Sequence, residues 1–312
     1  MGVYDAPQWL LSAFSRSAVG AGATAAPERI REAGADLIER WTSTGRTYHN
    51  LRHLTDVLAR VDELAEETHE PELVRLAAWY HGAVFDAAQV ATYANRGGED
   101  EISSARLARE QLTDLGVPTA AVDRVHSMVI ALVRHVVDPN DFDCAVLCDA
   151  DLAMLAAEPQ RYKAYLHDVR EEYAQIPMAD YLRARVRIVR KLLARPSLFV
   201  SPLGAAWEEP ARQNLGAELH KLEKVLAEME AAAPDDDSTA TDGSTPADRS
   251  STAAGPAASD ASAPTSAPAP STWNPSAWAT ANRATSARTG ASRIDAEQPQ
   301  TVPHRSGLTT GA

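Results

Sequence analysis

Large apolar residues recur every three to four positions along most of the chain, which is the spacing of one face of an α-helix. The alternation typical of strands and the Asn-Gly signal typical of hairpins do not occur convincingly. Pro27, Pro71, Pro118 and Pro159 stand where the first turn of a helix needs no amide donor. The pattern therefore predicts an all-α protein, with helices near 27–43, 50–67, 71–86, 100–115, 118–137, 142–157, 159–175, 178–195 and 208–230.

The helical pattern stops near residue 231. Beyond it the chain is dominated by Ala, Ser, Thr, Pro and Asp, with almost no periodic large apolar residues. Such a composition cannot bury enough apolar surface to offset the entropy lost on ordering. We therefore expect an N-terminal segment at 1–26, a single helical domain at 27–230 and a disordered low-complexity tail at 231–312.

Charge and composition restrict the partners. A net charge of −13 argues against a nucleic-acid-binding surface, because phosphate contacts need clustered Lys and Arg. The basic run "YLRARVRIVRKLLAR" carries apolar residues at helical spacing, which favours a basic helix that borders the core. No stretch reaches the roughly 20 apolar residues of a membrane span, and a signal-peptide pattern is absent from the N-terminus. The sequence does not indicate an oligomeric state.

The two cysteines, Cys144 and Cys148, are four residues apart, where a disulfide along one helix is geometrically implausible. They lack the second pair of ligands that a zinc site needs, so we expect small core residues. A reduced, cytoplasmic protein follows from this interpretation.

Three stretches place metal-binding side chains in apolar surroundings. "RTYHNLRHL" holds His49 and His53 one helical turn apart, "LAAWYHGAVFDAA" holds His81, and "DCAVLCDADLAML" holds Asp151. Two histidines at this spacing can also be a packing pair, so the other two stretches decide the interpretation. A carboxylate on an apolar helical stripe, as at Asp151, is costly unless a cation or a full set of hydrogen bonds meets it. Such ligands suit zinc, manganese or iron, and a carboxylate-rich site would add magnesium.

Taken in order, "GRTYHNLRHL", "AAWYHGAVFD", "EDEISSA", "CDADLAML" and "YKAYLHDVREEY" resemble the HD superfamily of metal-dependent phosphohydrolases over about residues 27–205. The resemblance implies an HD-type helical domain that holds one or two divalent ions. It implies hydrolysis of a small phosphate ester or nucleotide by a metal-bound water, with His53, His81 and Asp151 as metal ligands. The YHN turn also looks like that of cyclic-nucleotide phosphodiesterases, which makes His49 the general acid. Glu101 matches an acidic position that would orient a ligand histidine.

The chain departs from the HD pattern at position 82, where His81 is followed by Gly82 instead of aspartate. Loss of that carboxylate should weaken metal binding and could remove the second ion, since it supplies negative charge to the cation. Asp86 lies one turn beyond Gly82 and is a candidate substitute. The literal His167-Asp168 pair lies on a charged helix, and we interpret it as part of a solvated face.

Two further residues have open roles. Arg46 could bind a substrate phosphate or form a surface ion pair. His135 could approach the metal or substrate, or satisfy the last carbonyls of its helix. The sequence thus predicts a metal-dependent phosphohydrolase for a small phosphorylated molecule. The alternative is a catalytically degenerate HD fold that binds a phosphorylated ligand or partner without turnover.

Overall fold

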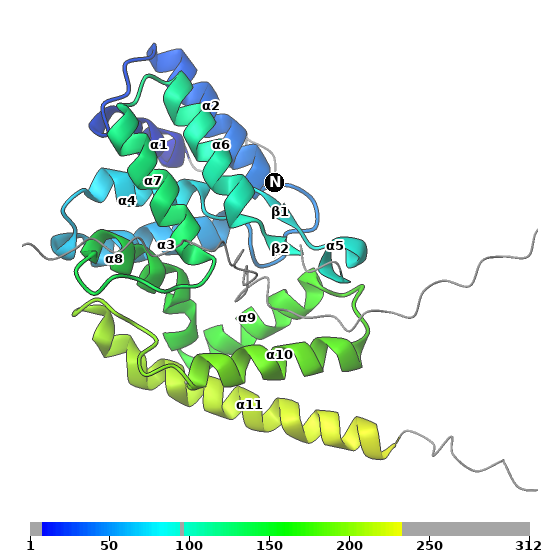
Figure 1. Ribbon diagram of the computed structural model, residues 1–312. Helices are drawn as coiled ribbons and strands as arrows, with labels where there is room; N and C mark the ends of the chain where they lie inside the picture. The colour runs from blue at the N-terminus through cyan, green and yellow to red at the C-terminus, as the bar shows by residue number, and fades with distance from the viewer. Residues whose placement is uncertain (1–7, 94–96, 233–312) are drawn as a thin grey trace, which may run out of the picture. The chain divides into compact units, whose positions relative to one another are not determined.

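The computed structural model describes residues 8–93 and 97–232, and its regular structure is almost entirely helical, as the sequence predicts (Figure 1). All described residues belong to one compact unit, 1–281, whereas the second unit, 282–312, and the predicted tail beyond residue 232 lie outside the described residues. The α-helices are α1 Gln8–Gly20, α2 Pro27–Trp41, α3 Leu51–Glu63, α4 Pro71–Tyr80, α5 Gln89–Tyr93, α6 Glu101–Asp114, α7 Thr119–Leu132, α8 Phe142–Leu152, α9 Pro159–Glu172, α10 Met178–Leu193 and α11 Glu208–Ala231. Short 3₁₀ turns are η2 Ala65–Glu67, η3 Ala153–Ala156 and η4 Gly204–Trp207.

The predicted helix at 71–86 ends early, at Tyr80. The chain then turns at His81 and Gly82 and enters a two-residue strand, β1 Phe85–Asp86, which pairs antiparallel with β2 Gly98–Glu99. Gly98 has φ +101°, a backbone conformation that glycine adopts without steric cost. A pair this short leaves almost no alternating pattern in the sequence, so the strands were not predicted.

The helix α1 was not predicted, although it lies within the expected N-terminal segment. Leu10, Phe14 and Ala18 follow one another at four-residue steps along one face and are fully buried. The ring of Phe14 stands edge-on to that of Trp79 on α4, with centroids 5.3 Å apart. The helix is therefore part of the core on which α4 rests.

Two clusters of buried apolar side chains form the interior. The first comes from α1 to α4 and α6 to α8, and the second from η3 and α9 to α11. On α8, Ala150 belongs to the first cluster and Leu152 belongs to the second. Before α3 the order is reversed, because Tyr48 belongs to the second cluster and Leu51 to the first. His53 and Asp151 therefore lie where the clusters meet.

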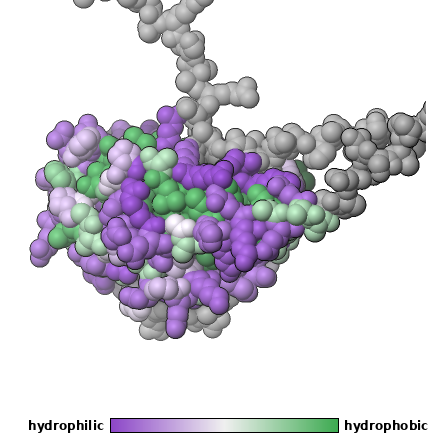
Figure 2. Space-filling view, turned by 90° about the horizontal axis from the view of Figure 1, so that it is seen from below, coloured by the Kyte–Doolittle hydropathy of each residue, from purple (hydrophilic) through white to green (hydrophobic). Residues whose placement is uncertain are grey.

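The basic run forms α10, which packs side by side with α11 (Figure 1). Its apolar face is buried through Val186 and Val189, while Arg190 pairs with Glu223 of α11 at 2.7 Å. The view from below shows apolar residues in a band bordered by hydrophilic ones (Figure 2).

Both cysteines are free and buried, as predicted. Among the described helices, none combines the length and the apolar character that crossing a membrane requires.

Candidate metal centre

The turn before α3 places two of the predicted histidines. Asn50 caps α3, and its side-chain oxygen accepts a hydrogen bond from the Arg52 amide at 2.9 Å. His49 lies just before this cap and His53 lies in the first turn of α3, and both side chains are buried. The cap thus fixes where the helix begins and hence where both imidazoles lie.

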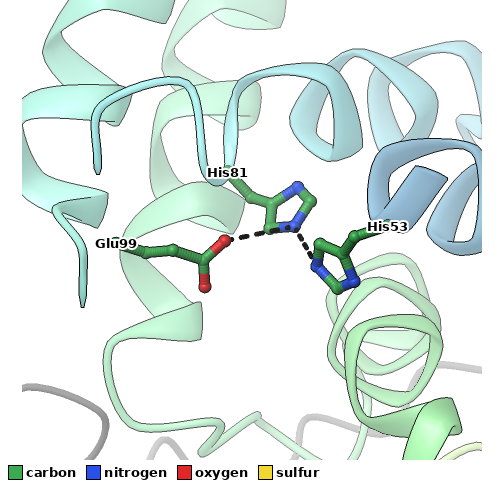
Figure 3. Close-up of side chains that lie close together, drawn as sticks. All are labelled: His53, His81 and Glu99. Carbon is green, nitrogen blue, oxygen red and sulfur yellow. Dashed lines mark hydrogen bonds and ion pairs between the residues drawn. The ribbon is translucent and has the colours of Figure 1, made fainter. Parts of the chain in front are cut away.

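His53 and His81 face each other across the interior. Their Nε2 atoms are 3.2 Å apart, as Figure 3 shows. Nδ1 of His81 lies 2.6 Å from the carbonyl oxygen of Ala78. Because a carbonyl can only accept, Nδ1 carries the proton and Nε2 keeps a lone pair for a ligand. Burial is the main cause that lowers the pKa of His81 to about 4, so its imidazole is neutral at physiological pH, as metal binding requires.

Asp151 joins this pair from the last turn of α8, as the sequence predicts. Its Oδ1 lies 3.4 Å from Nε2 of His53 and 3.7 Å from Nε2 of His81. Its Oδ2 lies 2.8 Å from Nε2 of His135. Burial alone would raise the pKa of Asp151, but hydrogen bonds from His135 and His53 hold it well below its ordinary value. The carboxylate is therefore charged and held between three imidazoles.

Glu99 is the residue of this centre that the sequence analysis missed. Its Oε1 lies 3.7 Å from Nε2 of His81 (Figure 3). A Cβ atom on Gly82 would lie 2.3 Å from that same oxygen. The carboxyl group of Glu99 thus lies beside His81, in the space that a side chain at position 82 would have to enter.

The pairing of β1 with β2 brings Glu99 to this position, since Glu99 is the register partner of Phe85. Its Oε1 is buried and has no hydrogen-bond partner. Burial, followed by the negative charge of Asp151, raises the pKa of Glu99 to about 8. A buried carboxyl oxygen without a partner is costly, and a cation is one way to satisfy it.

His53, His81 and Glu99 lie close enough together to hold one divalent ion, and Asp151 adjoins the two histidines. Ligand atoms that each lie about 2 Å from an ion are about 3 to 4 Å from one another. The distances of 3.2 to 3.7 Å among His53, His81 and Asp151, and from His81 to Glu99, meet that condition. In the described chain, the atoms of His53, His81 and Glu99 all lie within 4.8 Å of one another. Two imidazoles and two carboxylates are ligands that zinc, manganese and iron accept.

His49 lies beside this centre and is bound to Glu172 at the end of α9. Nδ1 of His49 is 2.5 Å from Oε2 of Glu172, and Oε1 of Glu172 accepts hydrogen bonds from the backbone amides of Tyr48 and His49. Nε2 of His49 is 3.9 Å from Oε2 of Glu99. Burial would raise the pKa of Glu172, but the charge and hydrogen bonds of His49 lower it. Glu172 therefore fixes both the turn and the direction of the imidazole.

A cleft reaches the centre from the side of α3 and α9. We call it the His53 cleft, and its lining includes Tyr48, His53, Asp151, Met154 and Arg161. Arg161 pairs with Asp56 at 2.6 Å in its wall. A small molecule in this cleft would contact two of the candidate metal ligands.

The remaining predicted residues occupy different places. Nη1 of Arg46 donates to the carbonyl of His49 at 2.9 Å, and its guanidinium stacks on Trp41 and Phe85, so Arg46 supports the turn from inside. Asp86 is exposed, and its carboxylate accepts from the amide of Ala88 at 2.8 Å, so the structure does not bring it to the centre.

Glu101 opens α6, two residues beyond Glu99. Burial and then the charge of Glu99 raise the pKa of Glu101 to about 9. His135 contacts Asp151 rather than only the end of its helix. His167 is exposed, as predicted.

The two residues that sequence reasoning missed had different signals. Glu172 was not among the predicted site residues, because its hydrogen bond with His49 joins residues 123 positions apart. Glu99 precedes Glu101 in "EDEISSA", and only the β1 and β2 pairing shows which acid reaches the histidines.

Comparison with family models, with curated proteins and with solved structures gives no match to this chain. The resemblance to the HD superfamily therefore rests on the motifs and their order.

Proposed function

We propose that the chain is a metal-dependent phosphohydrolase of the HD type, which acts on a small phosphate ester or nucleotide. One observation carries the proposal: His53, His81, Asp151 and Glu99 direct four ligand atoms at one another in the interior, at 3.2 to 3.7 Å between neighbours. These residues come from α3, the end of α4, α8 and β2, so no local packing requirement explains their convergence.

The chemistry of the donors supports a resident ion. His53, His81, Asp151 and Glu99 would hold it. When bound, a divalent ion supplies Lewis acidity and makes water nucleophilic at neutral pH. Asp151 brings a full negative charge, because its pKa is held low by the hydrogen bonds from His135 and His53. A second charge beside His81 comes from Glu99 once its proton is displaced.

Side chains of the protein supply the other roles in the proposed reaction. His49 is the general acid of the proposal, since Glu172 accepts from its Nδ1 and leaves Nε2 directed to the side of Glu99. Glu172 positions that imidazole. The His53 cleft is the route of the substrate in this proposal, because His53 and Asp151 both line it.

Metal analysis of freshly purified protein, followed by manganese titration, tests the proposal. We expect about one bound divalent ion, hydrolysis of at least one member of a panel of nucleotides and 4-nitrophenyl phosphate, and loss of both in His53→Ala and Asp151→Asn. His167→Ala is the matched control, because it removes an exposed histidine beside an aspartate and should change neither.

Two outcomes would count against the proposal. If His53→Ala binds manganese as tightly as the wild type, the four residues are not its ligands. If the ion is bound by these residues but no ester in the panel is hydrolysed, the alternative of a ligand-binding fold without turnover replaces the enzyme.

A further inference from the structure

A cavity of about 400 Å³ lies between α1, α3 and α4, where α1 packs against α4 (Figure 1). We call it the Trp79 cavity, and its lining includes Trp9, Arg16, Ser17, Leu58, Arg75 and Trp79. Its volume is typical of small-molecule sites, which span roughly 300 to 1,000 Å³. The candidate metal ligands do not line it, so the proposed hydrolysis gives this cavity no role.

Two buried donor groups meet at the inner end of the Trp79 cavity. Ser17 is 2% exposed and Trp79 is fully buried. Within the part of the chain that the structure describes, the hydroxyl of Ser17 and Nε1 of Trp79 form no hydrogen bond, and both atoms remain within reach of a molecule in the cavity. An indole N–H can only donate, and a buried donor that stays unpaired is costly. These two groups therefore need an acceptor oxygen from a ligand.

Arg16 supplies positive charge at the outer end. Its side chain is exposed, and no carboxylate of the described residues pairs with it. The other cation of the lining, Arg75, is held between Asp62 at 2.7 Å and Glu72 at 2.9 Å. Because those three side chains already satisfy one another, Arg16 is the charged group that a ligand can pair with.

The wall between the two ends is apolar. Leu58 is buried, whereas Trp9 is 55% exposed. An aromatic ring laid against this indole would remove apolar surface from water. Water alone can pair with Ser17 and Trp79, but it leaves Trp9 wet. The lining thus favours a ligand in which a ring separates an acceptor oxygen from an anionic group.

We propose that the Trp79 cavity binds a small hydroxyaryl carboxylate. The hydroxyl oxygen of the ligand accepts a hydrogen bond from Nε1 of Trp79 and contacts the hydroxyl of Ser17. The ring lies against Trp9 and Leu58, and the carboxylate pairs with Arg16 at the outer end. This inference goes beyond the proposed hydrolysis and does not depend on a bound metal.

Calorimetric titration of the full chain, freed of metal by a chelator, tests the inference with three probes. These are 4-hydroxyphenylacetate, phenylacetate, which lacks the hydroxyl, and tyramine, which carries an ammonium in place of the carboxylate. We expect 4-hydroxyphenylacetate to bind about two- to tenfold more tightly than phenylacetate, as one added hydrogen bond predicts. Tyramine should bind more weakly than 4-hydroxyphenylacetate, because its charge has the same sign as that of Arg16.

Ser17→Ala tests the inner end. It should raise the Kd for 4-hydroxyphenylacetate by about two- to tenfold and leave the Kd for phenylacetate unchanged. The variant should fold normally, because the hydroxyl of Ser17 forms no hydrogen bond within the described residues. Ser15→Ala is the matched control, since Ser15 lies on the same helix, donates to the carbonyl of Leu11 at 2.9 Å and does not line the cavity.

Arg16→Gln tests the outer end. It should raise the Kd for both carboxylates by about two- to fivefold, as expected for an exposed ion pair, and remove most of the salt dependence of binding. Arg31→Gln removes the same charge from an exposed position on α2 that does not line the cavity, and it should leave both quantities unchanged.

Four results would overturn the inference. The first is absence of saturable binding by either carboxylate. The second is equal weakening of both carboxylates by Ser17→Ala, which leaves the ligand hydroxyl without its partner in the cavity. The third is tighter binding of tyramine, which indicates a site for cations. The fourth is binding that is lost in His53→Ala but not in Arg16→Gln, which places the ligand at the His53 cleft and leaves the proposed function intact.

Discussion

Oε1 of Glu99 lies 3.7 Å from Nε2 of His81, in the space next to Gly82 where a side chain would have to begin. The ring of Trp41 closes the same space, with Cη2 2.5 Å from a Cβ built on Gly82. The carboxyl group of Glu99 can therefore occupy this position because residue 82 has no side chain. The carboxylate reaches the histidines from β2 instead of from the residue that follows His81.

The first prediction tests this exchange of carboxylates. Glu99→Gln keeps the size of the side chain and removes its charge, so manganese affinity should fall by at least about 10 to 100-fold, the range found even for residues that only orient metal ligands. Glu110→Gln removes an exposed carboxylate from α6 and should have no effect. Calorimetric titration measures both, and equal affinity of Glu99→Gln and wild type would show that Glu99 does not contact the ion.

A second prediction concerns Gly82 itself. Gly82→Ala places a methyl group against Glu99 and Trp41, and such overpacking typically costs about 1 to 3 kcal/mol. Gly82→Asp should be at least as harmful, although it restores the aspartate of the HD pattern. Gly216→Ala on α11 meets no atom within 4 Å and should stabilise slightly. Thermal denaturation compares the three variants. A melting temperature of Gly82→Asp at or above that of the wild type would show that the space beside position 82 is open.

The helices could be predicted because their information is local. Apolar spacing and prolines at first turns indicate α2, α4, α7 and α9 without knowledge of the rest of the chain. The same spacing placed Asp151 on an apolar helical stripe.

The missing parts of the centre depend on contacts between distant segments. Glu99 comes to His81 through a strand pair with two residues on each side, and Glu172 comes to His49 across 123 positions. Neither contact leaves a periodic signal. Arg46 was judged from its charge alone, whereas the rings of Trp41 and Phe85 hold it inside the turn.

A third prediction tests whether α1 belongs to the core. Phe14→Ala removes a fully buried ring that packs on Trp79, so the free energy of unfolding should fall by about 3 to 5 kcal/mol. Trp9→Ala removes a larger ring from the same helix, but Trp9 is 55% exposed, and its loss should change the stability much less. Chemical denaturation measures both variants. Similar small effects would mean that α1 is detached in solution.

A fourth prediction follows from the start of α8, the helix that carries Asp151. Asp141 caps this helix through the amide of Cys144 at 3.0 Å and pairs with Arg124. The hydrogen bond from Arg124 is the main cause that lowers the pKa of Asp141 below its ordinary value of 3.8. Asp141→Asn retains a capping oxygen but loses the charge, and it should cost about 0.5 to 1 kcal/mol at pH 7.

The sign of its pH dependence follows from the depressed pKa. The stabilisation by Asp141 is complete above the unfolded-state value and is lost as the pH falls through the lower value of the folded state. The difference in melting temperature between wild type and Asp141→Asn should therefore be constant from pH 7 to pH 5 and shrink toward pH 3. A difference that stays constant down to pH 3 would show that the charge of Asp141 contributes nothing.

The last prediction tests whether Glu172 acts by positioning the imidazole of His49 or only supports the fold of the turn. Under the proposed hydrolysis, His49→Gln removes the general acid and should lower kcat by about 10² to 10⁴-fold. Glu172→Gln should also lower kcat, because the imidazole loses the carboxylate that holds Nδ1, while KM and metal content stay unchanged. Because Glu172 acts through His49, adding Glu172→Gln to His49→Gln should cause little further loss of kcat. Steady-state kinetics of the four proteins complete the cycle. Multiplicative losses would mean that Glu172 supports the fold of the turn at Tyr48 and His49 independently of the imidazole.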